Sequence, residues 1–265
     1  VKIVGTSTCD LMISKNDKAI AGVCGVAADS VIPGFAGIEA GQSAVGDLFL
    51  WLVNRLGTQD YGKSRDEVFK NMTAQAANLR AGQSGLLSLD WNNGNRSLLT
   101  DVHLSGLLLG QTLHTRVHEI YRALIEATAF GALKIIERLE DSGTAVEKVV
   151  CCGGLAQKNE LMMQIYANVF NRPVSIAGSD QTCAAGAAIF AVAASKGIAV
   201  LEVQAQMSKA CRKEYFPQTE ENQVYTKIYQ IYSQLHEAFG VEGSSDDLYG
   251  VMKQLIKIQQ QVNHA

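Results

Sequence analysis

A short apolar run followed by two glycines most constrains how this chain can fold. The run from Val146 to Cys152 is mostly apolar and rich in β-branched residues, which is typical of an interior strand. Gly153 and Gly154 then remove two Cβ atoms where the chain must turn, and a helical pattern containing Asn159 follows. The stretch therefore predicts a strand, a tight turn and a helix within an open α/β sheet.

Such a turn is a candidate ligand site because ligands of open α/β sheets bind beyond the carboxyl ends of the strands. Bare glycine backbone allows close approach, and the beginning of a helix attracts negative charge. A tight turn without a ligand accounts for the same residues. The diglycine alone leaves both interpretations open.

The bulk composition excludes several classes of protein. The chain has 265 residues, 47% hydrophobic and 18% charged, which indicates one large globular domain or two small ones. A formal net charge of −3 and a pI near 6.0 give no electrostatic case for a nucleic-acid partner. No apolar run reaches transmembrane length and no signal peptide opens the chain, so no membrane partner is predicted.

The cysteines predict free thiols in a cytoplasmic protein. None forms a C-x-x-C pair, so no zinc site is predicted, and adjacent residues of a strand point to opposite faces and cannot bridge. Most of the six lie among apolar or small residues, which predicts burial in a reducing compartment. They are Cys9, Cys24, Cys151, Cys152, Cys183 and Cys211.

The first residues predict a β-hairpin with hydroxyl groups at its tip. Val1–Val4 and Leu11–Ser14 read as strands, and the chain enters the first of them without an initiator Met. We therefore expect a fragment of a longer protein. The tip, Gly5–Asp10, offers hydroxyls and backbone N–H groups of the kind that hold a phosphate. An ordinary Gly/Ser/Thr turn explains it equally.

A glycine-rich polar segment, residues 37–47, precedes a helical pattern. Glu39 could accept hydrogen bonds from a polyol, with Gln42 and Ser43 nearby. Alternatively, Ser43 or Asp47 caps the helix and Glu39 is solvated.

Other expectations concern structure. Ser64–Glu67 is a capping-box pattern, Trp91 is expected in the core, His118 partly exposed and Glu126 buried with a partner. The predicted elements are helices over about 64–78, 115–142, 182–191, 219–239 and 246–262, strands over 86–91 and 173–176, and a type I′ turn at Asn93-Gly94. The helix over 182–191 has so little side-chain bulk that tight packing on the sheet is expected.

Six segments together resemble one family, the C-terminal domain of the FGGY carbohydrate kinases, in the sugar kinase–Hsp70–actin superfamily. The likeness covers residues 1 to about 240. Two segments, GIEAGQSAVGD and LDWNNGNR, look particular to members that act on L-ribulose. The six are VGTSTCD, PGFAGIEAGQSAVGD, LDWNNGNR, IEATAFG, GGLAQKN and SDQTCAAGAA.

The resemblance implies a fold and a set of site residues. The fold would be a ribonuclease H-like (actin-like ATPase) α/β domain, a mixed sheet flanked by helices, spanning 1–265 with terminal helices over about 219–262. It would be the second of two domains that enclose ATP and sugar in a cleft. Glu39 would bind sugar hydroxyls, and the nucleotide would contact Gly5, Thr6, Ser7, Gly46, Gly153, Gly154 and Asn159.

The resemblance also implies an activity, ATP- and Mg²⁺-dependent phosphorylation of L-ribulose at its terminal hydroxyl. The first phosphate loop would lie on an N-terminal domain, and the catalytic aspartate in a segment a short distance before the hairpin. Both would precede this chain, so no catalytic residue and no metal ligand is assigned here. Gln111 and Leu124 depart from the family's usual residues in a structural segment. The resemblance is also compatible with a homodimer.

Two alternatives stay open. One is a kinase for another ketopentose or a polyol. The other is a non-catalytic, actin-like nucleotide-binding module, which would have no reason to keep the segment around Glu39.

Overall fold

The computed structural model describes residues 1–244 and 247–264. The strands are β1 (Lys2–Val4), β2 (Thr8–Ser14), β3 (Gly25–Ala28), β4 (Ala36–Ala40), β5 (Leu87–Leu89), β6 (Leu107–Leu109), β7 (Val149–Cys152), β8 (Val174–Ile176) and β9 (Lys213–Tyr215). The helices are α1 (Gly46–Arg55), η1 (Gln59–Tyr61), α2 (Arg65–Ala77), α3 (Val117–Asp141), α4 (Gly154–Lys158), α5 (Glu160–Phe170), α6 (Thr182–Lys196), α7 (Val200–Met207), α8 (Thr219–Gly240) and α9 (Val251–His264).

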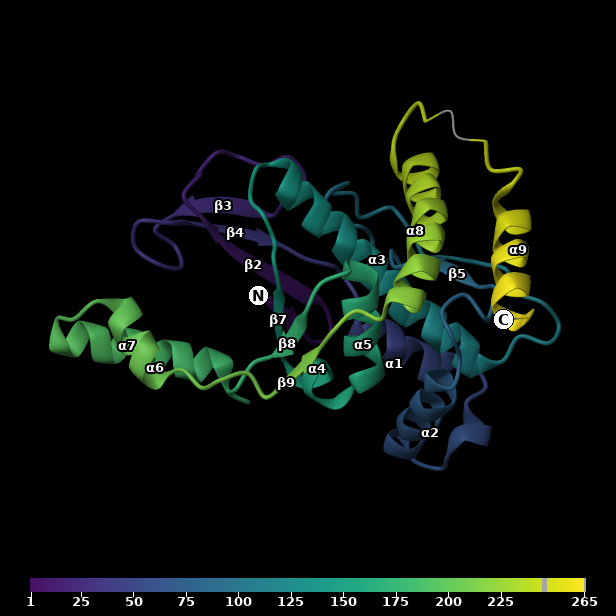
Figure 1. Ribbon diagram of the computed structural model, residues 1–265, viewed down its shortest axis with the longest axis horizontal. Helices are drawn as coiled ribbons and strands as arrows, with labels where there is room; N and C mark the ends of the chain where they lie inside the picture. Colours follow the sequence, from purple (N-terminus) through teal and green to yellow (C-terminus); the bar gives the residue numbers. More distant parts are fainter. Residues whose placement is uncertain (245–246, 265) are drawn as a thin grey trace.

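A mixed sheet organises the fold, as predicted. Its order is β3-β4-β2-β1-β7-β8-β9, and β5 and β6 form a separate antiparallel pair (Figure 1). The β1–β7 and β7–β8 pairs are parallel, and the other pairs of the large sheet are antiparallel. The N-terminal hairpin and the strand before the diglycine are therefore direct neighbours in the middle of the sheet.

Helices α3 and α5 lie beside the central strands (Figure 1). Val4, Cys151 and Val174 belong to one large buried cluster with apolar residues of both helices, such as Phe130 and Tyr166. Because side chains alternate along a strand, this clustering defines the covered face of the sheet. The predicted long amphipathic helix is confirmed as α3, which brings its apolar stripe to this face.

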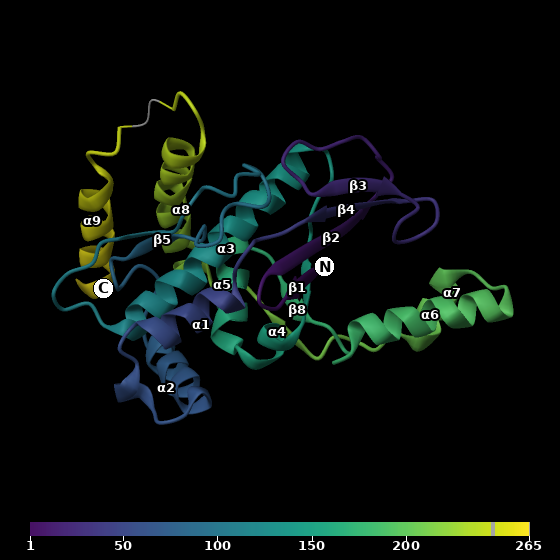
Figure 2. The same ribbon diagram turned by 180° about the vertical axis from the view of Figure 1, so that it is seen from behind.

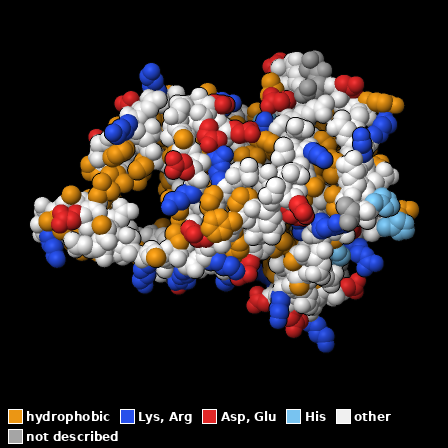
Figure 3. Space-filling model, viewed as in Figure 1, with side chains coloured by type: hydrophobic (Ala, Val, Ile, Leu, Met, Phe, Trp, Pro, Cys, Tyr) orange, Lys and Arg blue, Asp and Glu red, His pale blue; other side chains and the backbone are white. Residues whose placement is uncertain are grey.

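The small-residue helix α6 does not pack as expected. With α7 it forms an arm that extends beyond the sheet, away from α1, α2, α8 and α9 (Figures 1 and 2). Of the residues of α6, only Ala193 is buried, so the expectation of tight packing on the sheet is wrong. The α6–α7 arm borders a recess of about 550 Å³, lined mainly by apolar side chains of β2, α3 and the 31–32 loop and visible in Figure 3. Small side chains permit close packing but do not by themselves supply a partner.

The hairpin of β3 and β4 was not predicted. Glycine and alanine favour strands weakly, so residues 25–28 and 36–40 carry no clear strand pattern. Pairing of β4 with β2 supplies the missing stabilisation, from Asp10 opposite Ala40 to Ser14 opposite Ala36. Glu39 consequently lies on a strand and not in a loop.

Several smaller expectations are confirmed. Ser64 and Glu67 form the capping box of α2. Trp91 is buried, and Glu126 is buried with the Arg122 guanidinium 2.9 Å away. The two terminal helices are present as α8 and α9; residue 246, in the predicted start of the second, lies outside the described residues.

Other expectations are wrong. His118 is buried, with its Nδ1 2.9 Å from the Tyr61 hydroxyl, because η1 covers it. A turn forms at Gly94, whose N–H donates to the Trp91 carbonyl over 2.9 Å, but it is not of type I′ because Asn93 lacks the positive φ that this type requires. Neither Ser43 nor Asp47 caps α1, whose N-cap is Val45. All six cysteines are free, but only Cys151 and Cys152 are buried.

Candidate functional site

The tip of the N-terminal hairpin is docked on the beginning of α1. Gly46 N–H donates to the Gly5 carbonyl over 3.0 Å, and Val45 N–H donates to the Thr6 carbonyl over 2.7 Å. A Cβ on Gly46 would lie 2.6 Å from the Gly5 oxygen, so only glycine allows this approach. The first N–H groups of α1 are satisfied by the hairpin, which holds the tip in place.

The diglycine turn lies against the same hairpin. Gly153 has φ +96, and a Cβ on it would lie 2.4 Å from the Val4 carbonyl oxygen. Leu155 extends from this turn to within 3.0 Å of the Cβ position of Gly46. The structure thus brings together three of the segments singled out in the sequence, although they lie up to about 150 residues apart.

Two backbone N–H groups at the hairpin tip, those of Thr6 and Ser7, are free, within the described part of the chain, to bind an external acceptor. Gly5 N–H donates to the Ser7 carbonyl within the turn over 3.0 Å, so it is not available to a phosphate. The N–H groups of Thr6 and Ser7 have no acceptor among residues 1–244 and 247–264. Two neighbouring free N–H groups in a turn fit a phosphate oxygen, with Thr6 and Ser7 as the donors.

Gly154 and Asn159 differ in what they offer a ligand. A Cβ on Gly154 would meet nothing within 4 Å, so this backbone faces open space. The Asn159 side chain is buried and engaged: Oδ1 accepts from Met162 N–H over 3.0 Å, and Nδ2 donates to the Tyr121 hydroxyl over 2.9 Å. Asn159 therefore caps α5, and its buried side chain holds the end of the turn in place.

Glu39 lies on β4 beside the strand that leaves the hairpin. Cys9 Sγ donates to its Oε1 over 3.6 Å, and Arg96 Nη2 lies 3.8 Å from the same oxygen. The Glu39 side chain is 51% exposed, so the carboxylate has room for a further partner. Burial, followed by the charge of Glu39, raises the pKa of the Cys9 thiol.

Two segments that the sequence analysis treated separately interlock around this carboxylate. Asp90 Oδ2 accepts from Gln42 Nε2 over 2.7 Å, and Ser97 Oγ accepts from Gly41 N–H over 2.8 Å. Arg96 Nη2 donates to the Thr8 carbonyl over 3.1 Å and more weakly to that of Ala40. We call residues 90–97, which hold residues 39–42 in this way, the clamp. The role of Arg96 could not be read from its neighbours in the sequence, because its partners Thr8 and Ala40 are distant along the chain.

A buried network of polar side chains contacts the clamp through Asp90. Lys2 Nζ lies 3.0 Å from both carboxylate oxygens of Asp10 and from Gln42 Oε1. Tyr232 of α8 donates to Asp90 Oδ1 over 2.9 Å. Burial raises the pKa of Asp90, and the two donors oppose that shift.

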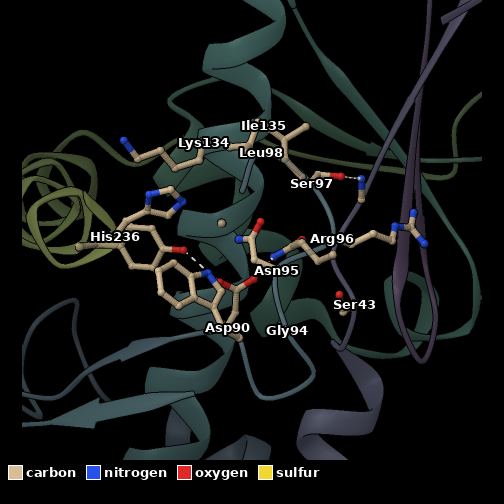
Figure 4. A pocket seen from close by; sticks show the side chains of 15 residues that line it. Ser43, Asp90, Gly94, Asn95, Arg96, Ser97, Leu98, Lys134, Ile135 and His236 are labelled. Atoms are coloured by element: carbon tan, nitrogen blue, oxygen red, sulfur yellow. Dashed lines mark hydrogen bonds between the residues drawn. The ribbon is translucent and has the colours of Figure 1, made fainter. Parts of the chain in front are cut away.

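The clamp borders a small cavity of about 10 Å³, enough for about one water molecule. Figure 4 shows Asp90 and His236 on one side of it and Arg96 reaching away toward the strands on the other. His236 packs edge-on against Trp91 with the ring centroids 5.2 Å apart. The cavity is far too small for a sugar or a nucleotide.

Metal and membrane sites receive no support from the described part of the chain. Over residues 1–244 and 247–264, no three His, Cys, Asp or Glu side chains gather in a way that could hold a metal ion. Within the same residues, every helix is too short or too polar to span a bilayer.

Comparisons with known proteins relate the chain to sugar kinases. The model of the FGGY family of carbohydrate kinases, C-terminal domain, matches residues 1–195. Ribulokinase from Geobacillus thermodenitrificans is 46% identical over 265 aligned positions, covering 96% of this chain and 46% of that protein. Ribulokinase from Staphylococcus aureus strain Newman is 39% identical over 242 positions, covering 90% of this chain and 44% of that protein. The chain thus spans about half the length of these curated relatives.

Solved structures share the fold. Xylulose kinase from Rhodospirillum rubrum superposes with a TM-score of 0.78 at 23% identity, over 89% of this chain and 46% of that one. Plasmodium falciparum glycerol kinase with ADP gives a TM-score of 0.68 at 16% identity, over 91% of this chain and 47% of that one.

Proposed function

The chain belongs to the FGGY family of carbohydrate kinases, and we propose that it is the C-terminal half of an ATP-dependent kinase that phosphorylates L-ribulose at its terminal hydroxyl. The match to ribulokinases at 39% to 46% identity supports this substrate. Because the chain spans about half of those relatives, the activity belongs to a longer protein in which residues 1–265 are one domain and an N-terminal half is its partner.

One observation carries the proposal. Cys9 Sγ contacts Glu39 Oε1, and Cys9 lies two residues along β2 from Ser7 at the hairpin tip. At about 3.3 Å per strand residue, a sugar held by Glu39 is roughly 7 Å along the strand from a phosphate held at the tip. Phosphoryl transfer requires this proximity of acceptor and phosphate. An assembly module would have no use for it.

We assign each part of the nucleotide site to residues whose geometry fits it. The N–H groups of Thr6 and Ser7 donate to phosphate oxygens, and Gly46 and Gly153 let the hairpin, α1 and the diglycine turn meet. Gly154 gives the nucleoside bare backbone to lie on. Asn159 holds that turn. When bound, MgATP would supply the phosphoryl group and the cation that neutralises its charge.

We assign Glu39 to the sugar and no described residue to the base. Glu39 accepts hydrogen bonds from sugar hydroxyls with the oxygen that faces solvent. Asp10, the other carboxylate close to the hairpin, is held in an ion pair with Lys2 at 3.0 Å and is 15% exposed. A carboxylate occupied in this way is unsuited to take a proton from the sugar. The base therefore comes from the partner half, and closure of the two halves completes the site. The six free cysteines fit a cytoplasmic protein.

The test has two parts. The gene product that contains this chain is assayed for ATP-dependent phosphorylation of L-ribulose, D-xylulose, glycerol and ribitol. The 265-residue chain is titrated calorimetrically with MgATP and with L-ribulose. Preference for L-ribulose in the first part, and weak nucleotide binding without turnover in the second, support the proposal. Preference for another acceptor makes the protein a different FGGY kinase. Turnover by the 265-residue chain alone refutes the assignment of the base to the partner half.

A further inference from the structure

The clamp places the Arg96 guanidinium 3.8 Å from the Glu39 carboxylate. We propose that Arg96 is a positioning residue, which holds Glu39 at the end of the sheet next to the hairpin so that the carboxylate faces the sugar. The inference rests on the proposed role of Glu39, and it adds a residue that acts through Glu39 without touching substrate.

Arg96 is anchored to the backbone of two strands, β2 and β4. Its Nη2 donates to the Thr8 carbonyl over 3.1 Å and lies 3.4 Å from the Ala40 carbonyl, the residue after Glu39. The guanidinium is therefore attached to the backbone of β2 and β4, and not only to the carboxylate. A rigid fork of donors suits this task better than a flexible ammonium.

Gly41 allows both the Thr8 backbone and the Arg96 side chain to approach closely. A Cβ on Gly41 would lie 2.5 Å from Arg96 Nη2 and 2.1 Å from the Thr8 carbonyl oxygen. Ser97 accepts from Gly41 N–H, and Asp90 accepts from Gln42, so contacts on both sides of Arg96 hold the same stretch. Four contacts from the clamp thus reach four consecutive residues, Glu39 to Gln42, in addition to the strand pairing of β4.

One oxygen of the Glu39 carboxylate lies close to both Arg96 and Cys9. Glu39 Oε1 is 3.8 Å from the guanidinium and 3.6 Å from the Cys9 thiol. Oε1 faces these two groups, and Oε2 has no partner among residues 1–244 and 247–264 on a side chain that is 51% exposed. The hairpin has separate anchors on α1 and on Gln42, whose carbonyl accepts from Thr8 N–H over 3.1 Å. Loss of Arg96 should therefore disturb the sugar side and spare the nucleotide side.

Cys9 reports on this arrangement without any substrate. The charged groups that face it are Glu39, Arg96 and Asp10; the two carboxylates raise the pKa of the thiol and Arg96 lowers it. The pH dependence of Cys9 alkylation, followed by peptide mass spectrometry, measures this pKa in the gene product that contains the chain. We expect the apparent pKa to rise in Arg96→Met and Arg96→Gln, to fall in Glu39→Gln, and to stay unchanged in the control Arg65→Met on exposed α2. An unchanged Cys9 pKa in a folded Arg96 variant overturns the proposal.

Steady-state kinetics provide a second test of the role of Arg96. We expect Arg96→Met to raise KM for L-ribulose about tenfold while KM for MgATP changes less than about twofold. The double variant Glu39→Gln with Arg96→Met should match Glu39→Gln alone, because Arg96 acts only through Glu39. Additive losses, or equal effects on both substrates, overturn the proposal. If the protein phosphorylates no sugar, the proposed function fails, and the Cys9 pKa of Arg96→Met in the Glu39→Gln background still decides the positioning role. A rise as large there as with Glu39 present means that Arg96 acts on the thiol directly and overturns the proposal.

Discussion

Gln42 and Asp90 meet in a buried hydrogen bond of 2.7 Å between Nε2 and Oδ2. The same amide donates to the Thr128 carbonyl over 2.8 Å, and its oxygen accepts from Lys2 over 3.0 Å. One side chain therefore connects the segment before α1 with the clamp, with α3 and with β1. Through Tyr232, Asp90 extends this connection to the terminal helix α8.

We expect Gln42→Leu to destabilise the protein. The substitution removes a donor from the buried Asp90 carboxylate and an acceptor from the buried Lys2, so the free energy of unfolding should fall by about 2–4 kcal/mol. Urea denaturation measures the change. Gln75→Leu, on the exposed face of α2, is the matched control and should alter stability by less than about 0.5 kcal/mol. A Gln42 variant as stable as this control would show that the network contributes little.

The Arg122–Glu126 pair on α3 should respond asymmetrically to substitution. Arg122 donates to Glu126 over 2.9 Å and to the Tyr225 hydroxyl over 3.0 Å, and all three residues are buried. Arg122→Met leaves the buried Glu126 carboxylate without its cation, with the Tyr225 hydroxyl as its remaining donor at 2.8 Å, and should cost about 3–5 kcal/mol of unfolding free energy. The double variant with Glu126→Leu should recover part of this loss in urea denaturation, because no charge then remains buried. A double variant less stable than Arg122→Met would contradict this account.

The two adjacent glycines should separate folding from binding. Gly153→Ala places a Cβ 2.4 Å from the Val4 carbonyl oxygen at φ +96, so thermal denaturation should show a loss of at least about 2 kcal/mol. Gly154→Val points into open space and should leave the fold intact while abolishing nucleotide binding. Calorimetric titration with MgATP checks the second variant. Retained affinity in folded Gly154→Val would remove this turn from the proposed nucleotide site.

Glu39→Ala in the gene product should affect the sugar selectively. The half-exposed carboxylate is proposed to accept hydrogen bonds from sugar hydroxyls, and the hairpin has its own anchors on α1. KM for L-ribulose should rise by about 10- to 100-fold, and KM for MgATP should change little. Steady-state kinetics with each substrate varied in turn provides the measurement. Similar increases in both constants would count against a sugar contact.

His236 should make stability depend on pH between about 4 and 6.5. Burial, with the nearby Lys134 charge, lowers the pKa of His236 to about 4 from an ordinary value of 6.5. The unfolded state then binds the proton more tightly, so this contribution is complete above pH 6.5 and is lost as pH falls toward 4, by up to about 3 kcal/mol. Urea denaturation at several pH values should show a shallower acid loss in His236→Gln than in the control His114→Gln, whose histidine is exposed. Parallel curves for the two variants would exclude His236 as the cause.

Local patterns predicted much of the fold. Ser64 and Glu67 indicated the start of α2, the apolar spacing indicated α3, and the run before Gly153 indicated β7 and the turn that follows. Such signals depend on residues within a few positions of one another, so they are readable without knowing where the rest of the chain lies. The same holds for the hairpin tip around Thr6.

Contacts between distant segments could not be read in this way. The strand pairing of Glu39 and the anchoring of Arg96 on β2 and β4 were not predicted, and α6 was wrongly expected to pack on the sheet. Each outcome depends on which strands pair and on which side chains meet across tens of residues.

The amino-acid sequence by itself determined the family, the order of the elements and the candidate residues at the hairpin, the diglycine turn and Glu39. Only the tertiary structure decided that Gly5 uses its N–H within the turn, that Asn159 supports the turn from inside, and that Arg96 and Asp90 hold the strand carrying Glu39. The physical reason is that hydrogen bonds and ion pairs form over about 3 to 4 Å in space whatever the separation in sequence, so the partner of a polar side chain is known only once the sheet has brought the segments together.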